Sequence, residues 1–264
     1  MTGRAGFINL FRVINNFNNL NLNLAEDILY GKLKLIQPEL GPRVNMDTVL
    51  LASWVRLRAG KFKFIELGSA AGAVSLMLAL RFINSNFHIT GIEIQDELNN
   101  LAKQNLILNN LQDKAEFICG DLRDKELLNN LRLDYYDGVV ANPPYETLTR
   151  GRKSEALTAA IARQDLTATI QDIASSASKL LKTRGRFFAV FNSERASSFI
   201  NALLINNLTP KRIKFIYPRL NENSKIFLIE CVKNGGEGLI IEPPLIVLDD
   251  NNNYTPELLS AYKI

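Results

Sequence analysis

The sequence has few of the residues that build metal centres and disulfide frameworks. Its 264 residues include two cysteines and one histidine. Cys119 and Cys231 stand far apart in the chain, and neither has a second cysteine or histidine at the spacing of a ligand pair. This composition predicts no zinc or other metal site and no disulfide framework. It is typical of a protein of the reducing cytoplasm.

The sequence also lacks an apolar run long enough to cross a bilayer. The longest uncharged apolar stretch, Ser69 to Leu80, has about a dozen residues, whereas a membrane span needs about 20. The net charge is +4 and the isoelectric point is about 9.0, which permits an anionic partner without requiring one. With 47% hydrophobic residues, the chain is expected to be a globular protein without a membrane span.

The first 24 residues differ in composition from the rest. They are rich in asparagine, carry Arg4 and Arg12, and contain no acidic residue. This composition superficially resembles a targeting peptide, but Arg12 and the asparagines interrupt any apolar core, and no small-residue cleavage pattern follows. We therefore expect residues 1–24 to be a loosely ordered extension. Residues 25–264 show no internal repeat or linker and are expected to form one domain.

Strand and helix patterns alternate along residues 25–264. Apolar runs bounded by turns predict strands, and apolar residues at helical spacing predict the helices between them. The connections have the length that right-handed parallel crossovers require. This order predicts a doubly wound α/β fold with a mostly parallel sheet and helices on both faces. A short strand is predicted within residues 32–38. The main predicted strands are residues 61–67, 88–94, 115–121, 135–141, 185–191, 211–218 and 225–233, with a helix at 157–181 and an edge strand within 239–249.

The turn from Glu66 to Gly72 follows the first of these parallel strands and has the composition of a cofactor loop. Gly68 and Gly72 let the backbone approach a ligand, and the amides that open the next helix face an anionic group. The pattern is not the G-x-G-x-x-G fingerprint, because Ala70 stands where such loops often have glycine. A packed strand-to-helix turn is therefore the alternative interpretation.

Two acidic residues end the next two strands. Glu93 comes 25 residues after Gly68, near the distance at which an acid meets the ribose hydroxyls of a nucleoside cofactor. Asp121 ends the third strand, the next position along the same crevice, from which a carboxylate can reach an adenine amine. Each also has a structural alternative: Glu93 as a solvent-facing neighbour of a helix cap, and Asp121 as the cap of the following helix.

The tetrapeptide Asn142-Pro143-Pro144-Tyr145 follows the fourth strand and is more specific. The two prolines fix the backbone and remove two donors, so the Asn142 side chain and the Pro143 carbonyl remain as acceptors. Two acceptors that bind both N–H groups of a planar amine favour its pyramidalisation, and Tyr145 can stack on a base. The alternative interpretation is a rigid surface turn.

Together these residues resemble the class I Rossmann-like methyltransferases that methylate amino groups. The segment from Ile36 to Ala52, with Gln37, Arg43 and Asp47, narrows the resemblance to the bacterial methyltransferases that modify N6 of an anticodon-loop adenine in a valine tRNA. The likeness covers roughly residues 26–264. It implies that a strand near the C-terminus of the chain runs antiparallel in the sheet. It also implies S-adenosylmethionine as cofactor, tRNA as partner and a cytoplasmic location.

The resemblance assigns roles to the residues above. The implied cofactor site contains Glu66, Gly68, Gly72, Glu93, Asp121 and Asn142. The implied catalytic residues are Asn142, Pro143 and Tyr145. A flipped adenine would place N6 between the Asn142 side chain and the Pro143 carbonyl, stack on Tyr145 and attack the sulfonium methyl in line, without a metal.

Two departures from the family pattern concern the cofactor loop and its surroundings. Family loops usually read D-x-G-x-G-x-G, whereas this chain has Glu66 for the aspartate and Ala70 for the middle glycine. Pro42 stands where the family more often has an aromatic residue. The loop changes bear on the position of the cofactor's amino-acid end, and hence on activity, rather than on the fold. Neither departure removes the acceptors of the Asn142 turn.

Basic residues are candidates for phosphate contacts. Arg150, Arg152 and Lys153 come just after the Asn142 turn and are expected to bind substrate RNA. The cluster formed by Lys211, Arg212, Lys214 and Arg219 is a second candidate, with solvated surface as the alternative for both. His88 is expected to be structural, since the proposed chemistry needs no imidazole base.

Three other functions remain open at this level. The same tetrapeptide serves enzymes that methylate a glutamine of peptide release factors, although those usually carry a longer helical region before the cofactor loop. A DNA or ribosomal RNA amine is a second possible acceptor. The third is a non-catalytic RNA-binding partner that keeps the fold without the cofactor.

Overall fold

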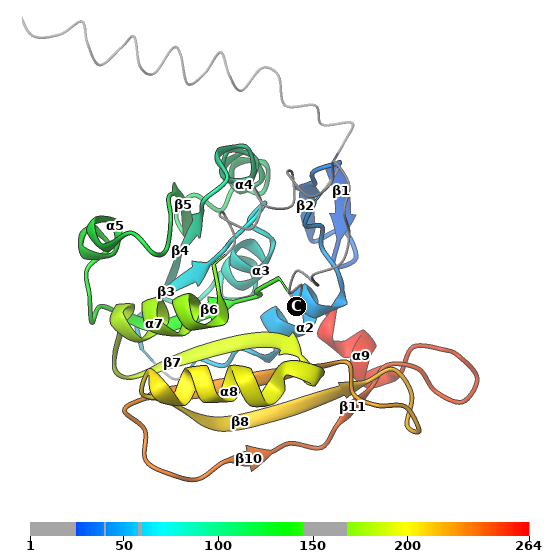
Figure 1. Cartoon of the computed structure of the whole chain (residues 1–264). Helices are drawn as coiled ribbons and strands as arrows, with labels where there is room; N and C mark the ends of the chain where they lie inside the picture. The colour runs from blue at the N-terminus through cyan, green and yellow to red at the C-terminus, as the bar shows by residue number, and fades with distance from the viewer. Residues whose placement is uncertain (1–24, 40, 58–59, 145–167, 264) are drawn as a thin grey trace, which may run out of the picture.

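The apolar runs that alternate with turns in the sequence form one large sheet. The computed structural model describes residues 25–39, 41–57, 60–144 and 168–263. Its nine-stranded sheet has the order β10-β8-β9-β7-β6-β3-β4-β5, and β11 also pairs with β8 (Figure 1). The bounds are β3 Phe62–Leu67, β4 Phe87–Glu93, β5 Ala115–Cys119, β6 Tyr136–Ala141, β7 Leu181–Asn192, β8 Leu208–Tyr217, β9 Ile226–Lys233, β10 Ile240–Ile241 and β11 Leu245–Ile246.

The strand directions confirm the predicted fold class. Strands β7, β6, β3, β4 and β5 are parallel, and β9 runs antiparallel to both β7 and β8. Strand β3 pairs with β4 on one side and with β6 on the other, so the strand order reverses there. In such sheets a crevice for ligands opens at the carboxyl ends of the strands beside this switch point.

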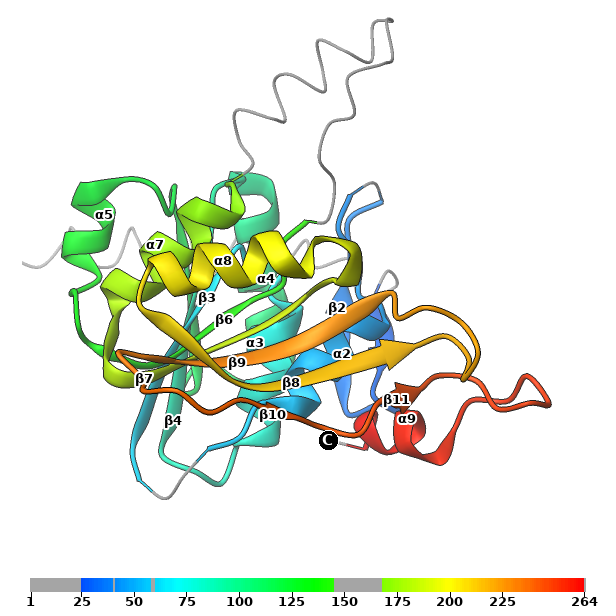
Figure 2. The ribbon, with the colours of Figure 1, turned by 60° about the horizontal axis from the view of Figure 1, so that its bottom comes forward.

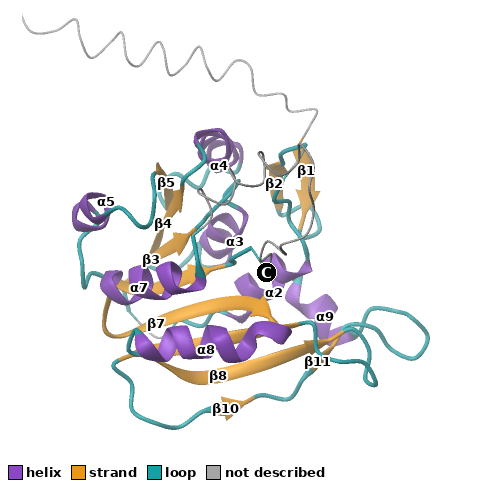
Figure 3. Ribbon diagram, in the orientation of Figure 1, coloured by secondary structure: helices purple, strands orange, loops and turns teal. Residues whose placement is uncertain are grey.

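Helices cover both faces of the sheet because side chains alternate along each strand. In β3, Phe64 belongs to one core cluster and Ile65 and Leu67 to the other. Figures 1 and 3 show α7 and α8 in front of the sheet, and Figure 2 shows α2 and α9 on its other side. The first cluster packs under α2 Met46–Trp54, α3 Ala73–Arg81, α4 Asp96–Leu108 and α9 Pro256–Ala261, and the second under α5 Lys125–Asn130, α7 Ile170–Leu180 and α8 Ala196–Ile205.

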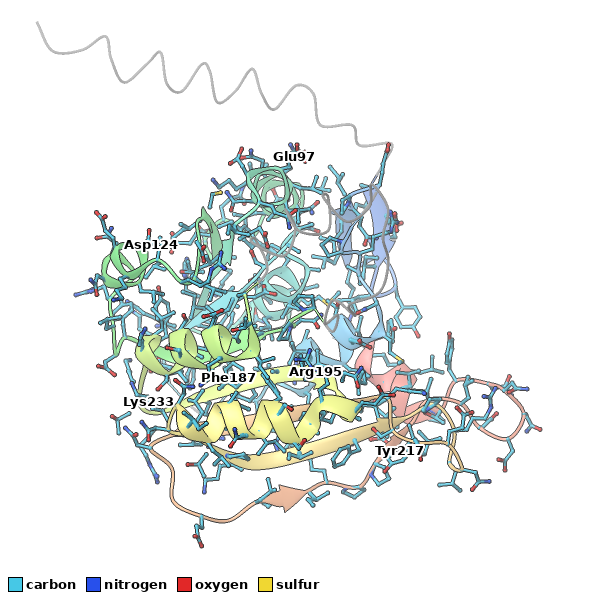
Figure 4. The ribbon with its side chains drawn as sticks, in the orientation of Figure 1. Glu97, Asp124, Phe187, Arg195, Tyr217 and Lys233 are labelled. Carbon is cyan, nitrogen blue, oxygen red and sulfur yellow. The ribbon has the colours of Figure 1, made fainter. Side chains whose placement is uncertain are left out.

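The second cluster is rich in phenylalanine. Phe187, labelled in Figure 4, lies between the sheet and the helices in front of it. The rings of Phe191 and Phe199 stack with centroids 4.4 Å apart, and both side chains are completely buried. Burial of such large rings makes this face a rigid platform for the strand ends that carry the site.

A separate two-stranded hairpin lies beside the main sheet. Strands β1 Ala25–Ile28 and β2 Leu33–Ile36 are antiparallel, and β2 contacts α3 and α4 (Figure 1). The sequence predicts β2 but not β1. The four residues of β1 include two acids and have no alternating apolar pattern, so only pairing with β2 makes them a strand.

Three predicted elements have different bounds in the structure. The edge strand expected within 239–249 is divided into β10 and β11, because Pro243 and Pro244 between them lack the N–H groups that a ladder needs. Strand β7 begins at Leu181 rather than Gly185. Helix α7 begins after Thr169, which closes a capping box with Asp172. The expected helical residues 157–167 and the expected extension 1–24 lie outside the described residues.

Candidate active site

A cavity opens beside the switch point, at the carboxyl ends of β3 and β6. It brings together three parts of the chain that are distant in sequence: the segment after β2, the loop after β3, and the end of β6. Its wall is formed by Leu35, Ile36, Gln37, Pro42, Arg43, Val44, Thr48, Glu66, Gly68, Ser69, Ala70, Ala71, Ala73, Val74 and Asn142. Of the predicted site residues, Glu66, Gly68 and Asn142 therefore line one cavity.

The loop between β3 and α3, residues 68–72, turns sharply. Gly68, Ala70 and Gly72 all have positive φ angles, at 75°, 47° and 85°. A Cβ atom at Gly72 would lie 2.6 Å from the Phe117 ring, so only glycine fits there. Ala70 adopts the left-handed conformation at a steric cost, which explains why related loops have glycine at its position. The loop geometry is therefore kept with alanine in place of glycine.

Glu66 lies at the end of β3, under the loop, and is 2% exposed. Its Oε2 atom accepts hydrogen bonds from the Ser75 backbone N–H at 3.0 Å and from the Ser75 hydroxyl at 2.5 Å. Burial raises the pKa of Glu66 to about 8, against the lowering effect of the Ser75 bonds. The side chain is therefore mostly protonated at neutral pH. A cation in the cavity would favour its ionised form.

Glu93, at the end of β4, supports the loop from below. Its side chain is buried, and its Oε2 accepts from the Ala70 N–H at 2.8 Å while its Oε1 accepts from the Gln95 N–H at 3.0 Å. The solvent-facing alternative is wrong, because the carboxylate is enclosed between the loop and the start of α4. Oε1 also lies 3.5 Å from the Gln95 side-chain nitrogen, so Oε2 is the oxygen that retains a lone pair. The expected contact with ribose hydroxyls stays a prediction.

Asp121 lies farther along the same edge, beyond β5. Its carboxylate accepts three hydrogen bonds from the Arg123 side chain, at 2.9 Å, 3.0 Å and 2.7 Å, and Arg123 holds the pKa of Asp121 below its usual value. Asp121 does not cap the following helix, because Asp124 is the N-cap of α5. The capping alternative is thus wrong. The expected contact of Asp121 with an adenine amine stays a prediction.

Asn142 follows directly after β6 and faces the cavity. Its Nδ2 lies 3.5 Å from the Thr48 hydroxyl oxygen, near the long limit of a hydrogen bond. Within the described residues no donor reaches the Asn142 Oδ1, which can therefore accept from a ligand. Pro143 is buried and Pro144 is exposed. Tyr145, Arg150, Arg152 and Lys153 lie outside the described residues.

Thr48 is a cavity residue whose role sequence reasoning missed. It is in the first turn of α2, where the Asn45 side chain caps the helix by accepting from the Thr48 N–H at 3.0 Å. The Thr48 hydroxyl donates to the same Asn45 oxygen at 3.0 Å, which leaves its oxygen to receive Asn142. The N-cap pattern of Asn45 was a local signal for the helix start. The contact with Asn142 has no local signal, because the two residues are 94 positions apart.

The segment after β2 closes one side of the cavity. Gln37 accepts from the Val44 N–H at 2.7 Å and donates to Glu26 of β1 at 2.7 Å. Arg43 forms an ion pair with Glu26 and donates to the Pro38 carbonyl at 3.1 Å. These bonds tie the segment into a closed loop on the hairpin. Pro42 therefore lies in a part of the cavity wall that these bonds hold in place, at the position where the family more often has an aromatic residue.

The side chains of the second basic cluster all make contacts within the protein. Arg212 is 6% exposed, lies over the Trp54 ring and pairs with Glu230 and Glu242. The other three side chains are also engaged within the protein: Lys211 with the backbone carbonyls of residues 236–238, Lys214 with Glu257, and Arg219 with Glu222 and Asn252. For Arg212, both the candidate RNA contact and the alternative of solvated surface are wrong, because its guanidinium is buried in an ion-pair network.

His88 does not line the cavity. His88 lies near the amino end of β4, five residues before Glu93 and far from the carboxyl ends of the strands. The described part of the chain contains no group of three histidine, cysteine, aspartate or glutamate residues placed to hold a metal ion. Within the same residues, no helix has the length and apolar character of a membrane span.

Comparison with known families and sequences relates the chain to methyltransferases. Residues 42–210 match the family model of the methyltransferase small domain. A tRNA1(Val) (adenine(37)-N6)-methyltransferase of Bacteroides fragilis strain YCH46 is 28% identical over 170 residues, which are 64% of this chain and 68% of the relative. A protein of the same name from Bacteroides thetaiotaomicron is 27% identical over 202 residues, or 76% of this chain and 80% of the relative.

Solved structures share the fold. A predicted O-methyltransferase from Agrobacterium tumefaciens superposes with a TM-score of 0.65 at 21% identity, over 82% of this chain and 96% of the other. The [4+2]-cyclase SpnF superposes with a TM-score of 0.53 at 12% identity, over 72% of this chain and 81% of the other. At these identities the likeness shows the fold alone. Since one of the two is a cyclase, the fold does not determine the reaction.

Proposed function

The chain belongs to the methyltransferase small domain family and is an S-adenosylmethionine-dependent methyltransferase, and from this premise we propose that it methylates N6 of an adenine in tRNA, in the anticodon loop of a valine tRNA. One observation carries the proposal. Asn142, followed by two prolines, faces the cavity that the Gly68 loop also lines. An acceptor for an amine and the loop for the cofactor thus share one cavity.

The residues of the cavity fit S-adenosylmethionine. The Ser69 hydroxyl is buried in its wall and has no partner among the described residues, so a ligand can supply one. Glu66 can balance the cofactor's ammonium group, because a nearby cation favours its ionised form. The loop from Gly68 to Gly72 would hold the amino-acid end, and Glu93 the ribose. When bound, the cofactor supplies an electrophilic methyl group.

The chain's own residues would prepare the amine. Thr48 receives the Asn142 Nδ2, which turns the Asn142 Oδ1 toward an incoming N–H group. The Pro143 carbonyl is the second acceptor, since proline contributes no competing N–H. Hydrogen bonds to both amine protons localise the nitrogen lone pair and stabilise the positive charge that develops on it. The proton released after transfer can pass to solvent, because an alkylated amine is strongly acidic.

The choice of tRNA as substrate rests on relatives and on sequence. The two Bacteroides proteins are named as methyltransferases of adenine 37 in tRNA1(Val). Arg150, Arg152 and Lys153 follow the Asn142 turn and are the proposed phosphate contacts beside the extruded base. The burial and pairing of Arg212 leave this first cluster as the better candidate.

Methyl transfer from labelled S-adenosylmethionine tests the proposal. The purified chain is incubated with unmodified valine tRNA, a release-factor substrate, or DNA, and the products are analysed by mass spectrometry. We expect N6-methyladenosine in the tRNA, formed about a hundredfold or more slowly with Asn142→Ala. N5-methylglutamine in the release factor would contradict the proposal, as would methyladenine in DNA alone. RNA binding without any methylated product would identify a non-catalytic partner.

A further inference from the structure

Asn105 of α4 and Asn109, the C-cap residue of this helix, bind β2 as a neighbouring strand would. Asn105 accepts from the Ile36 N–H at 2.7 Å and donates to the Ile36 carbonyl at 2.9 Å. Asn109 accepts from the Lys34 N–H at 2.9 Å and donates to the Lys34 carbonyl at 2.6 Å. One helical turn rises about 5.4 Å and alternate strand residues lie about 7 Å apart, so residues four apart on a helix can serve residues two apart on a strand.

Asn105 makes one bond that Asn109 does not. Its Nδ2 also donates to the Ala71 carbonyl in the cofactor loop at 3.0 Å. Asn105 is completely buried, whereas the bonds between Asn109 and Lys34 are exposed. Ile36 and Ala71 both line the cavity. A single carboxamide therefore joins two walls of the proposed cofactor site.

The chemistry of the carboxamide suits this position. An asparagine side chain has two N–H donors and one acceptor oxygen, and here both donors and the oxygen are used. The hairpin has only two strands and needs such external support, because an isolated hairpin is at best marginally stable. If the carboxamide is removed, the buried carbonyls of Ile36 and Ala71 lose a donor at a cost that burial makes large.

We propose that Asn105 is a positioning residue of the cofactor site: its carboxamide sets the spacing between β2 at Ile36 and the loop at Ala71, and thereby the affinity for S-adenosylmethionine. The inference rests on the assignment of this cavity to that cofactor. It concerns a helix residue that does not line the cavity and belongs to none of the sequence motifs.

Asn105→Asp is the sharpest variant, since it keeps the shape and replaces the shared donor group with an acceptor. Asn109→Asp is the matched control, because it makes the same change one turn away, at a contact with β2 but not with the loop. Calorimetric titration with S-adenosylmethionine should give a Kd raised about tenfold or more for Asn105→Asp. The Kd of Asn109→Asp should stay within about threefold of the wild-type value.

Hydrogen exchange provides a readout that does not depend on activity. In Asn105→Asp, exchange should become faster in peptides that contain Ile36 and in those that contain Ala71. In Asn109→Asp, it should become faster around Lys34 alone. If Asn105→Asp does not fold, Asn105→Ser removes the three-way bridge without adding charge and should show the same rise in Kd.

Two results would overturn the inference. One is wild-type affinity in a folded Asn105 variant, and the other is an equal rise in Kd for Asn109→Asp, which would assign the effect to the hairpin rather than to the bond with the loop. Failure of the proposed function is distinguishable from both. A wild-type chain that binds no S-adenosylmethionine would remove the premise, and one that binds it but leaves tRNA unmethylated would leave Asn105 as a positioning residue.

Discussion

The two sides of the cavity are held in very different ways. On the proposed cofactor side, Glu93 and Asn105 bind the loop after β3, and Glu66 binds Ser75 in the first turn of α3. On the proposed acceptor side, the Asn142 amide has one long contact among the described residues, with Thr48. If the proposed roles hold, we expect a cofactor pocket formed in advance and an acceptor group whose geometry tightens when the substrate binds. Catalytic hydrogen bonds that are long in the free enzyme commonly shorten in the reactive complex.

Truncation of the Asn142 side chain is expected to have the largest effect, and to change turnover without changing cofactor affinity. Asn142→Ala is expected to lower kcat by about two orders of magnitude or more and to leave the Kd for S-adenosylmethionine within about threefold, because the lost contact is made in the transition state. Single-turnover methylation of tRNA and calorimetry measure the two quantities. Asn192→Ala, at the end of the neighbouring strand β7, is the control and should keep normal turnover. An Asn142→Ala enzyme with near-normal kcat would exclude the proposed role.

The opposite change is expected on the cofactor side. Glu93→Ala leaves the N–H groups of Ala70 and Gln95 without their acceptor and removes the proposed partner of the ribose. We expect the Kd for S-adenosylmethionine to rise about thirtyfold, the equivalent of about 2 kcal/mol, with a smaller effect on kcat at saturating cofactor. Glu93→Gln keeps an acceptor, so its Kd should lie between those of the wild type and Glu93→Ala. Unchanged affinity in Glu93→Ala would show that neither contact supports binding.

Glu66 makes the cofactor side sensitive to pH. Its pKa of about 8 in the folded protein exceeds the ordinary value of 4.5, so between these values the folded state keeps a proton that the unfolded state releases. The free energy of unfolding should therefore fall as pH rises, by at most about 1.4 kcal/mol per pH unit from this group. This contribution is fully present below pH 4.5 and is lost as pH rises through about 8.

Denaturant unfolding of the cofactor-free protein at pH 5, 6 and 7 measures this dependence. The comparison is with Glu66→Gln, which cannot ionise and retains an acceptor for Ser75. The stability of the variant relative to wild type should increase steadily over this range. A difference that does not change with pH would mean that Glu66 titrates near its ordinary pKa.

The smallest expected effect concerns the strained position in the loop. Ala70 has a φ angle of 47°, which glycine adopts without steric cost. Ala70→Gly should change the free energy of unfolding by no more than about 1 kcal/mol, with relief of strain opposed by the greater flexibility of the unfolded chain. The Kd for the cofactor should stay within about threefold. Ala79→Gly, in α3 but not in the cavity wall, is the control and should only destabilise. A large loss of affinity in Ala70→Gly would show that the methyl group contacts the ligand.

Much of the site could be predicted because its signals are local. Strand endings predicted the places of Glu66, Glu93 and Asp121, and the paired prolines predicted a rigid turn at Asn142. The periodic pattern of a strand or helix can be recognised within a few residues. Residues that end parallel strands are then expected at one edge of the sheet. The same reasoning failed for Arg212, because its position in a basic run does not reveal that acidic residues from other strands enclose it.

The sequence by itself determined the order of the main strands and helices, the turn chemistry of the loop and the place of Asn142 directly after a strand, since each depends on neighbouring residues. Only the tertiary structure decided which polar side chains hold these parts in place. Asn105 binds Ile36 across 69 positions, and Thr48 meets Asn142 across 94. Such contacts leave no periodic pattern, because a buried donor needs a partner in space and any distant segment of the chain can supply it.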